Sequence, residues 1–323
     1  MRDLETEGEN KAIIWRKYSE IRGRVRFAVS PDGCRMYRWL RKWALALGWR
    51  WEPLAFLLPW LPRTRSTELL AKGLTDLAYA RGARREFGDD QWTALTEGTI
   101  VLCYHKFSLP GGERSAFVIP IDQFLRQIKV LESAGYRFIT IRAWIDAWKR
   151  REVIGGRTAI VTIDDGTSDL ADIAEPELRR TGIRPALYVV RDWIGKPGYL
   201  SADQIDTLAK DGCEIGSHSQ SHQRLTRLTE DQQRREIIDG RSELAAATGV
   251  RPETFAYPYG DCDAASQRLV REAGFAAALG VERGYAYLHS SPWNLPRFVV
   301  DGRWPIWRFK LVVFSGTRLH GLI

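Results

Sequence analysis

The hydrophobic and polar positions of this chain follow two different patterns. From residue 99 onward, short β-branched apolar runs alternate with segments whose apolar residues recur at helical spacing. The runs predict strands over residues 99–104, 137–140, 158–163, 186–190, 214–217, 254–257 and 276–280. The spaced segments predict helices over residues 122–134, 141–151, 170–181, 201–210, 230–248 and 264–273. Strands that alternate with helices favour a parallel sheet covered by helices, which is an α/β fold.

Residues 1–98 have a different character. Trp39, Leu40, Trp43 and Leu47 recur at helical spacing, which predicts a basic amphipathic helix over residues 36–47, and a second helix is expected over residues 67–85. This region also holds seven of the 13 tryptophans: Trp15, Trp39, Trp43, Trp49, Trp51, Trp60 and Trp92. We therefore predict a helical, basic, tryptophan-rich region over 1–98 and an α/β domain over 99–323.

Two interpretations of the N-terminal region stay open. Basic residues interleaved with Trp and Leu over residues 36–62 are typical of a segment that lies at a membrane surface. The same tryptophans could instead pack a small helical lobe onto the main domain. The net charge of +8 is concentrated here, but the region has no recognised nucleic-acid-binding motif. We therefore do not expect nucleic acid as a partner.

Composition narrows the expected compartment. No stretch of about 20 apolar residues is present, so a transmembrane helix is not expected. The first residues, MRDLETEGENK, lack the order of a secretory signal. The four cysteines are scattered without C-x-x-C spacing, which suits free thiols in a reducing compartment. We expect a cytoplasmic protein, in contact with the inner face of the membrane if residues 36–62 bind there.

The most unusual strand is the one in TAIVTIDDGTSD, residues 158–169. It is apolar and β-branched, and it ends in two adjacent carboxylates, Asp164 and Asp165. Asp-Gly is a common turn dipeptide, so a simple turn is one interpretation. The other is a site in which one carboxylate binds a metal and the other takes a proton.

Other chemically active residues also stand where predicted strands end. His105 follows the first strand, His218 follows 214–217, and Tyr257-Pro258-Tyr259 follows 254–257. In a β/α barrel, the C-terminal ends of the strands carry the active site. This coincidence favours the metal interpretation of the aspartates.

Residues 216–222 read GSHSQSH and hold two of the five histidines. His218 and His222 are four residues apart, so one helical turn would place both imidazoles on the same face. Two histidines, one carboxylate and a water form a recurrent hydrolytic zinc arrangement.

TIDDG, GSHSQSH and FAYPYG occur in that order, together with LCYHKF, FLRQIKVLESAGYRFITI and LPRFVV. This set resembles the polysaccharide deacetylases of the NodB-homology, carbohydrate esterase family 4 type, in the branch whose third motif is FAYPYG. The resemblance extends over residues 99–313. It implies a distorted (β/α) barrel, to which this chain adds the N-terminal helical segment.

The resemblance also implies residue roles. Asp164 would be the general base, and Asp165, His218 and His222 would bind a divalent metal, for which zinc is the best match to the ligand types. The third motif would line the substrate groove with Tyr257 and Pro258, and Tyr259 would offer its backbone N–H to the oxyanion.

The sequence departs from the family pattern in two places. The usual general acid is a histidine in a late Leu-x-His motif, and the candidates here are His105, which we favour, His289 and His320. Many members carry an arginine where this chain has Ala256, as is usual in the FAYPYG branch. Trp293 is either a groove wall for the acetyl methyl or a core residue.

These observations predict a metal-dependent hydrolase that removes N-acetyl groups from amino sugars of a polysaccharide or a lipid-linked glycan precursor. One rival is a sugar-binding pseudoenzyme of the same fold, since the usual acid and arginine are missing. Another is a deacylase or deformylase that acts on a different amide.

Overall fold

The computed structural model of the chain describes residues 98–152, 154–288 and 290–315. They belong to one compact unit, Glu97–Ile323. The predicted helices over 36–47 and 67–85, and the proposed membrane-surface segment 36–62, lie outside the described residues. So does the division of the chain at residue 98, which stays a prediction.

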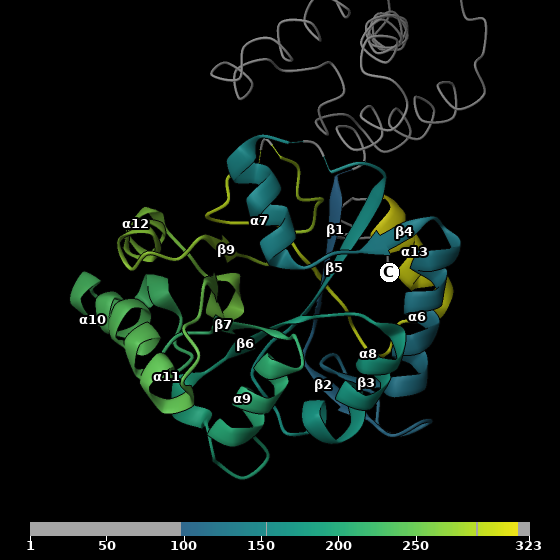
Figure 1. The fold of residues 1–323 in the computed structure, drawn as a ribbon, viewed down its shortest axis with the longest axis horizontal. Helices are drawn as coiled ribbons and strands as arrows, with labels where there is room; N and C mark the ends of the chain where they lie inside the picture. The colour runs from purple at the N-terminus through teal and green to yellow at the C-terminus, as the bar shows by residue number, and fades with distance from the viewer. Residues whose placement is uncertain (1–97, 153, 289, 316–323) are drawn as a thin grey trace, which may run out of the picture. The chain divides into compact units, whose positions relative to one another are not determined.

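A parallel sheet forms the centre of the described unit (Figure 1). Its strands follow the order β10-β1-β5-β6-β7-β8-β9, and β4 pairs with the first half of β5. Their bounds are β1 Thr99–Tyr104, β4 Tyr136–Phe138, β5 Arg157–Ile163, β6 Ala186–Val189, β7 Glu214–Ser217, β8 Thr254–Ala256, β9 Ala277–Leu279 and β10 Phe298–Val299. A separate parallel pair joins β2, Lys106–Ser108, to β3, Val118–Pro120. The predicted parallel α/β architecture is confirmed.

The sheet curls so that its two edges approach each other. β9 and β10 are the edge strands, and an isolated parallel bridge joins Leu279 of β9 to Leu295, just before β10. The backbone N–H of Leu295 also donates to the carbonyl of Ala278 (2.8 Å). An irregular segment over residues 292–297 thus connects the edges, which makes the barrel distorted rather than regular.

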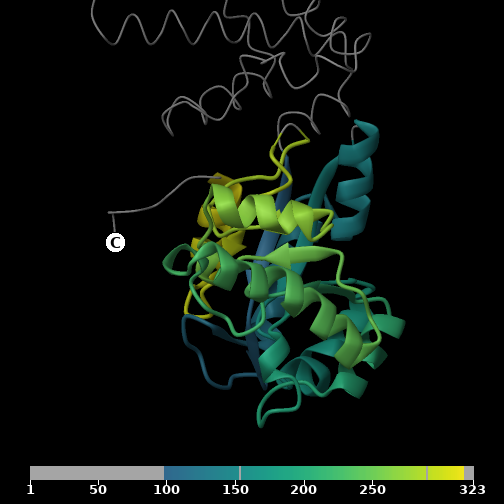
Figure 2. The same cartoon turned by 90° about the vertical axis from the view of Figure 1, so that its left-hand side faces the viewer.

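Helices pack around the sheet (Figures 1 and 2). The α-helices are α6 Ile121–Ser133, α7 Ile141–Arg150, α8 Glu175–Thr181, α9 Ala202–Lys210, α10 Glu230–Arg234, α11 Gly240–Thr248, α12 Ala264–Glu272 and α13 Ile306–Ser315. Short 3₁₀ and π-helical turns also occur: η3 Leu170–Ala174, η4 Arg191–Trp193, η5 Leu225–Arg227, η6 Arg235–Asp239 and η7 Pro258–Gly260. The helix predicted over 230–248 is interrupted by the π-helical turn η6, and β2, β3, β10 and α13 were not predicted from the sequence.

The helix ends follow from local sequence. Ser201 caps α9 by accepting from the N–H of Gln204, and the Gln204 side chain accepts from the Ser201 N–H in return, a complete capping box. α7 begins at the cap Thr140 and buries its Trp144 face. Because most of the helices hide an apolar face, three hydrophobic clusters form around the sheet.

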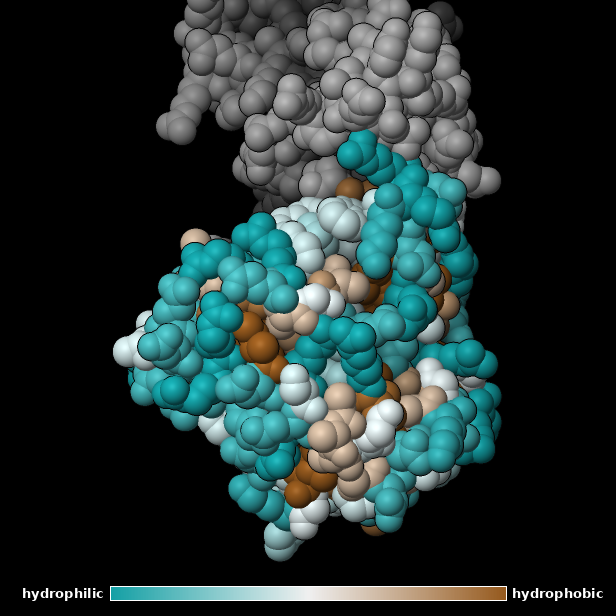
Figure 3. All heavy atoms as spheres, turned by 60° about the vertical axis from the view of Figure 1, so that its left-hand side comes forward, coloured by the Kyte–Doolittle hydropathy of each residue, from teal (hydrophilic) through white to brown (hydrophobic). Residues whose placement is uncertain are grey.

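The face of the described unit that Figure 3 shows is mostly hydrophilic. On the face seen in Figure 3, hydrophobic side chains form small areas separated by hydrophilic ones. Among the described residues, no helix is long and apolar enough to cross a membrane.

Candidate active site

Asp164 follows β5 and lies inside the barrel with 3% exposure. The guanidinium of Arg297 donates to both of its carboxylate oxygens, at 2.7 Å to Oδ1 and 2.8 Å to Oδ2. Arg297 is itself fully buried and is held by the carbonyl of Gly280 (2.8 Å) and the hydroxyl of Thr162 (3.2 Å). A planar guanidinium matches a carboxylate in this two-bond geometry, so the Asp164 carboxylate is fixed in orientation.

Asp165, the next residue, faces a different environment. Its Oδ1 lies 3.7 Å from Nε2 of His218 and 3.6 Å from Nε2 of His222. Ligand atoms of a tetrahedral zinc ion are about 3.3 Å apart, given bond lengths near 2.0 Å. One carboxylate oxygen and two imidazole nitrogens are also the donor types that zinc accepts. The three residues therefore fit a divalent metal such as zinc.

The His218 imidazole presents a lone pair to this position. Nδ1 of His218 lies 2.8 Å from the carbonyl of Ala256, so Nδ1 carries the proton and Nε2 is free to bind a metal. Burial lowers the pKa of His218 to about 4 and also lowers that of His222. Both rings are consequently neutral near pH 7, as ligation requires.

The two aspartates differ in acidity because their neighbours differ. Burial acts to raise the pKa of Asp164, but the charge and hydrogen bonds of Arg297 hold it well below its usual range. For Asp165, burial and the negative charge of Asp164 together raise the pKa to about 7. A cation bound between Asp165 and the histidines would offset that unfavourable charge.

The loop that carries the histidines is not helical. His218 and His222 meet because Ser219 and His222 adopt left-handed backbone conformations (φ 68° and 63°), which fold the loop back on itself. The ring centroids lie 4.8 Å apart. The expected contact was right, but the helical turn predicted to produce it was wrong. A spacing of four residues can be closed by a tight loop as well as by a helix.

Backbone strain is concentrated around this cluster. The described residues include five non-glycine positions with positive φ: Arg151, Asp165, Ser219, His222 and Tyr259. Four of them belong to the predicted site or the histidine loop, while Arg151 ends α7. Such conformations cost about 1–3 kcal/mol each and persist only where surrounding contacts hold them.

A buried glutamate supplies contacts that hold the loop. Glu236, in η6, accepts from the backbone N–H (2.9 Å) and the hydroxyl of Ser221. The N–H of Gln220 donates to the Glu236 carbonyl (3.0 Å). Gly240, one turn later, allows this approach, because a Cβ there would lie 3.0 Å from the Gln220 nitrogen. The π-helical turn therefore supports the histidine loop.

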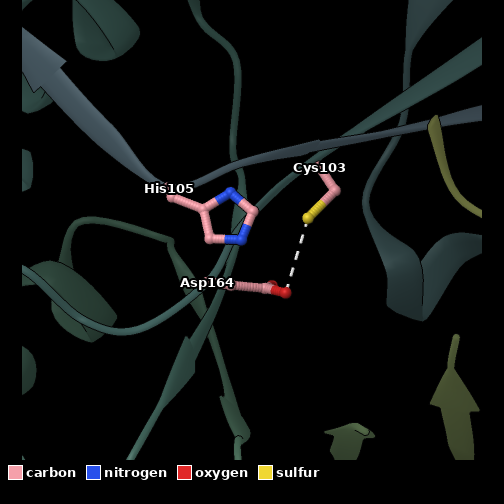
Figure 4. Close-up of side chains that lie close together, drawn as sticks. All are labelled: Cys103, His105 and Asp164. Carbon is pink, nitrogen blue, oxygen red and sulfur yellow. Dashed lines mark hydrogen bonds between the residues drawn. The ribbon is translucent and has the colours of Figure 1, made fainter. Parts of the chain in front are cut away.

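Cys103, His105 and Asp164 form a second group beside the first (Figure 4). The Cys103 thiol donates to Oδ2 of Asp164 at 3.4 Å and is fully buried. Burial raises the pKa of this thiol and lowers the pKa of His105. Nδ1 of His105 is buried without a hydrogen-bond partner among the described residues. Because Arg297 engages both Asp164 oxygens, this group suits proton handling better than metal binding.

The residues of the third motif lie partly in the hydrophobic core and partly at the site. Tyr257 is fully buried in the cluster beneath α12, and its hydroxyl donates to the carbonyl of Trp293 (2.9 Å). Trp293 packs on the same cluster. Pro258 is buried as well, whereas Tyr259 is 52% exposed and its ring lies 4.6 Å from that of His222. The structure thus brings Tyr259 to the site, and substrate contacts of Tyr257, Pro258 and Trp293 stay predictions.

Sequence reasoning overlooked Arg297 and Cys103. Both stand in segments that carry the resemblance, LPRFVV and LCYHKF, so the signal was present. Arg297 supplies the arginine that Ala256 replaces in the third motif. The candidate acids His289 and His320 lie outside the described residues, and His105 is the candidate that the structure brings to Asp164.

Comparisons with known proteins relate this chain to deacetylases. Residues 153–278 match the family described as "Polysaccharide deacetylase". YxkH of Bacillus subtilis (strain 168), provisionally named a polysaccharide deacetylase, is 24% identical over 201 residues, which are 62% of this chain and 71% of YxkH.

Solved structures share the fold. The Streptococcus pyogenes deacetylase PplD in complex with acetate aligns with a TM-score of 0.60 at 17% identity, covering 67% of this chain and 98% of that one. IcaB from Ammonifex degensii aligns with a TM-score of 0.58 at 24% identity, covering 68% and 97%. The findings therefore support the polysaccharide deacetylase (NodB-homology, carbohydrate esterase family 4) family of carbon–nitrogen hydrolases, through a family match over residues 153–278 and a shared fold.

Proposed function

We propose that this protein removes N-acetyl groups from amino sugars of a polysaccharide or a lipid-linked glycan precursor. The observation that carries the proposal is the contrast between two consecutive aspartates. Asp164 is fixed by Arg297, and Asp165 lies against two neutral imidazoles. Metal-assisted amide hydrolysis uses both features, a fixed proton acceptor and a metal site with an open position.

Asp165, His218 and His222 would hold the divalent metal, and zinc best matches their donor atoms. When bound, the ion supplies a water of lowered pKa and polarises the amide carbonyl. The backbone N–H of Tyr259 is proposed as a second donor to the developing oxyanion, as the family resemblance implies.

Asp164 would accept the proton of the attacking water. Its low pKa keeps it ionised throughout the neutral range, and Arg297 and Cys103 fix its orientation. Its Oδ2 lies 3.9 Å from Nε2 of His218, so the carboxylate borders the metal-ligand group. A carboxylate of such low pKa is a weak base and would hold the proton only briefly.

His105 would deliver a proton to the leaving amine. Its ring lies beside the Asp164 carboxylate (Figure 4), so a proton accepted by Asp164 has a short route to it. Burial keeps His105 neutral before the reaction, and the charge of Asp164 opposes that effect. The imidazole would therefore act as an acid only after the water has given up its proton.

The pseudoenzyme interpretation loses one of its reasons, because Arg297 takes the place of the missing arginine. A different acyl group, such as formyl, would be hydrolysed by the same chemistry. We also propose that the protein is cytoplasmic. Residues 36–62 would then contact the membrane and bring the enzyme to a lipid-linked substrate.

The test is acetate release from N-acetylglucosamine oligomers, measured together with bound metal by elemental analysis. The wild type should bind about one metal per chain and release acetate. Asp164→Asn should keep the metal and lose at least about 100-fold in kcat, the low end for removing a general base. A wild type that binds metal but releases acetate from no oligomer would count against the proposed acyl group. Equal turnover in Asp164→Asn would exclude Asp164 as the base.

A further inference from the structure

Arg224 lies beside the candidate active site with its positive charge unpaired. It follows His222 by two residues and is exposed. Its guanidinium carbon lies 4.2 Å from the centroid of the Tyr259 ring, and the centroid of that ring lies 4.6 Å from that of His222. Among the described residues, the guanidinium has no hydrogen bond and no ion pair. Its N–H donors are therefore free to bind an acceptor at the edge of the site.

The segment that carries Arg224 is tied to the loop that carries Tyr259. The N–H of Thr226 donates to Oδ2 of Asp261 (3.0 Å), and the Thr226 hydroxyl donates to the same oxygen (2.8 Å). Leu225, between Arg224 and Thr226, is fully buried. The carboxylate of Asp261 thus binds Thr226 and makes no ion pair with Arg224. These contacts hold the segment in place without neutralising the arginine.

The contact with Tyr259 orients the guanidinium but does not satisfy its donors. The face of an aromatic ring attracts a cation, yet it offers no oxygen acceptor to the N–H groups. A phosphate or a carboxylate can accept two parallel hydrogen bonds from one guanidinium, which is the strong, oriented contact typical of arginine. An exposed arginine held over a ring beside the site therefore suits a negatively charged oxygen group.

The charges of the site also favour such a group. Arg297 balances the charge of Asp164, and the two histidines of the site are neutral near pH 7. A divalent cation beside Asp165 would leave one positive charge in excess among these groups, and Arg224 adds another. A field of this sign attracts anions and raises their local concentration.

We propose that Arg224 binds a phosphate or carboxylate group that the substrate carries next to the acetamido sugar. The inference rests on the proposed function and deepens it, because the two groups belong to two kinds of substrate. A phosphate on C1 is what a lipid-linked glycan precursor carries, whereas a carboxylate belongs to an acidic sugar of a polysaccharide. A neutral polymer would leave the guanidinium without an acceptor.

The experiment compares kcat/KM for acetate release from N-acetylglucosamine 1-phosphate, N-acetylmuramic acid and the neutral methyl glycoside of N-acetylglucosamine. The wild type should prefer one charged substrate by about 10-fold or more, the size expected of a hydrogen bond between charged groups. Preference for the 1-phosphate would identify a phosphate-linked precursor, and preference for N-acetylmuramic acid an acidic polysaccharide. Because Arg224 is exposed, the preference should shrink as salt is raised. Equal kcat/KM for all three substrates would overturn the inference.

Arg224→Met should bring the charged and neutral substrates within about 2-fold of each other, through KM, because the charged hydrogen bonds are lost. Arg224→Lys should keep part of the preference, since an ammonium retains the charge but not the two parallel donors. Arg227→Met is the matched control, because it removes the same charge from another exposed residue of this segment that contacts no ring of the site. It should keep the full preference.

Two results with these variants would overturn the inference. If Arg224→Met lowered kcat/KM equally for charged and neutral substrates, the arginine would only hold Tyr259 in place. If the preference survived in Arg224→Met, the anion would bind the metal or another cation instead.

Calorimetric titration of the charged and neutral sugars into Asp164→Asn distinguishes failure of this inference from failure of the proposed function. Tighter binding of a charged sugar, weakened about 10-fold when Arg224→Met is added, would support the inference even if the wild type released no acetate. Equal binding of charged and neutral sugars would overturn it, while acetate release by the wild type still supported the function.

Discussion

The site contains two groups of three residues that lie side by side, and their carboxylates differ in their contacts and in their pKa. We call Cys103, His105 and the proposed base Asp164 the base group, and the proposed metal ligands Asp165, His218 and His222 the ligand group. In the base group, hydrogen bonds from Arg297 and Cys103 engage the carboxylate. In the ligand group, an imidazole nitrogen of each histidine lies beside the carboxylate.

The comparison shows how consecutive, chemically identical residues acquire different pKa values. Asp164 and Asp165 share a strand end, but Arg297 lowers the pKa of the first, while burial and the first carboxylate raise the pKa of the second. A site with two negative charges and one buried guanidinium favours a cation on the carboxylate that Arg297 does not reach. The two adjacent aspartates thus differ in acidity because their side-chain contacts differ.

The base group should depend most strongly on Arg297. Arg297→Met removes a fully buried partner and leaves the Asp164 carboxylate unpaired, so we expect unfolding to become easier by about 3–5 kcal/mol. Urea denaturation measures this. Adding Asp164→Leu should recover much of the loss, because no buried charge then remains.

Arg303→Met provides the control for charge removal. Arg303 pairs with Asp301 at 2.7 Å, but its side chain is 64% exposed, so little change is expected. Equal destabilisation by Arg297→Met and Arg303→Met would show that the buried ion pair contributes no more to stability than the exposed one.

Substitutions in the ligand group should lower metal affinity. His222→Ala removes one of the three proposed ligands, and we expect metal affinity to fall by at least about 100-fold, beyond what loss of a merely orienting group costs. Competition with a chromophoric chelator measures the affinity. His105→Ala, in the base group, should keep the metal and lose turnover. If both variants lost metal equally, the division into two groups would be wrong.

The contribution of the ligand group to stability should also depend on pH, through Asp165. An unfolded aspartate has a pKa near 3.9, whereas burial and the Asp164 charge raise that of Asp165 to about 7. Between these values the folded, metal-free protein binds more protons than the unfolded chain, so this group's contribution to stability falls as pH rises and the loss is complete above about pH 7.

Asp165→Asn removes that titration. In chelator-treated protein, the variant should be more stable than the wild type by about 1–3 kcal/mol near pH 8, with the difference shrinking toward pH 4. His218 contributes the opposite slope, because its lowered pKa makes stability rise with pH, but it does so in both proteins. A difference that grew toward low pH would contradict the raised pKa of Asp165.

The fold could be predicted because its signals are local. β-branched runs and helical spacing marked most strands and helices, and all three ligands stand at strand ends or in one short motif. The conformation of the histidine loop could not be predicted, since the left-handed angles at Ser219 and His222 depend on support from Glu236, another element.

The positions of two other side chains depend on how the sheet folds in three dimensions. Arg297 reaches Asp164 only because residues 292–297 bring the sheet edges together. Tyr257 follows the alternation of β8, so it packs with Phe255 toward α12. Proximity to a motif does not tell which face of the strand a residue takes.

The smallest expected effect tests the third contact of the base. Cys103→Ala removes one weak donor to Asp164 and leaves both bonds from Arg297, so kcat should fall only about 2- to 5-fold with KM and metal content unchanged, within the roughly 1 kcal/mol of a weak hydrogen bond. Cys103→Ser should restore kcat, because the hydroxyl can donate to the same oxygen. Cys213→Ala, at a partly buried thiol in another part of the fold, is the control and should leave kcat unaltered. If Cys103→Ser were as slow as Cys103→Ala, the thiol would matter for packing, and Arg297 alone would orient the carboxylate.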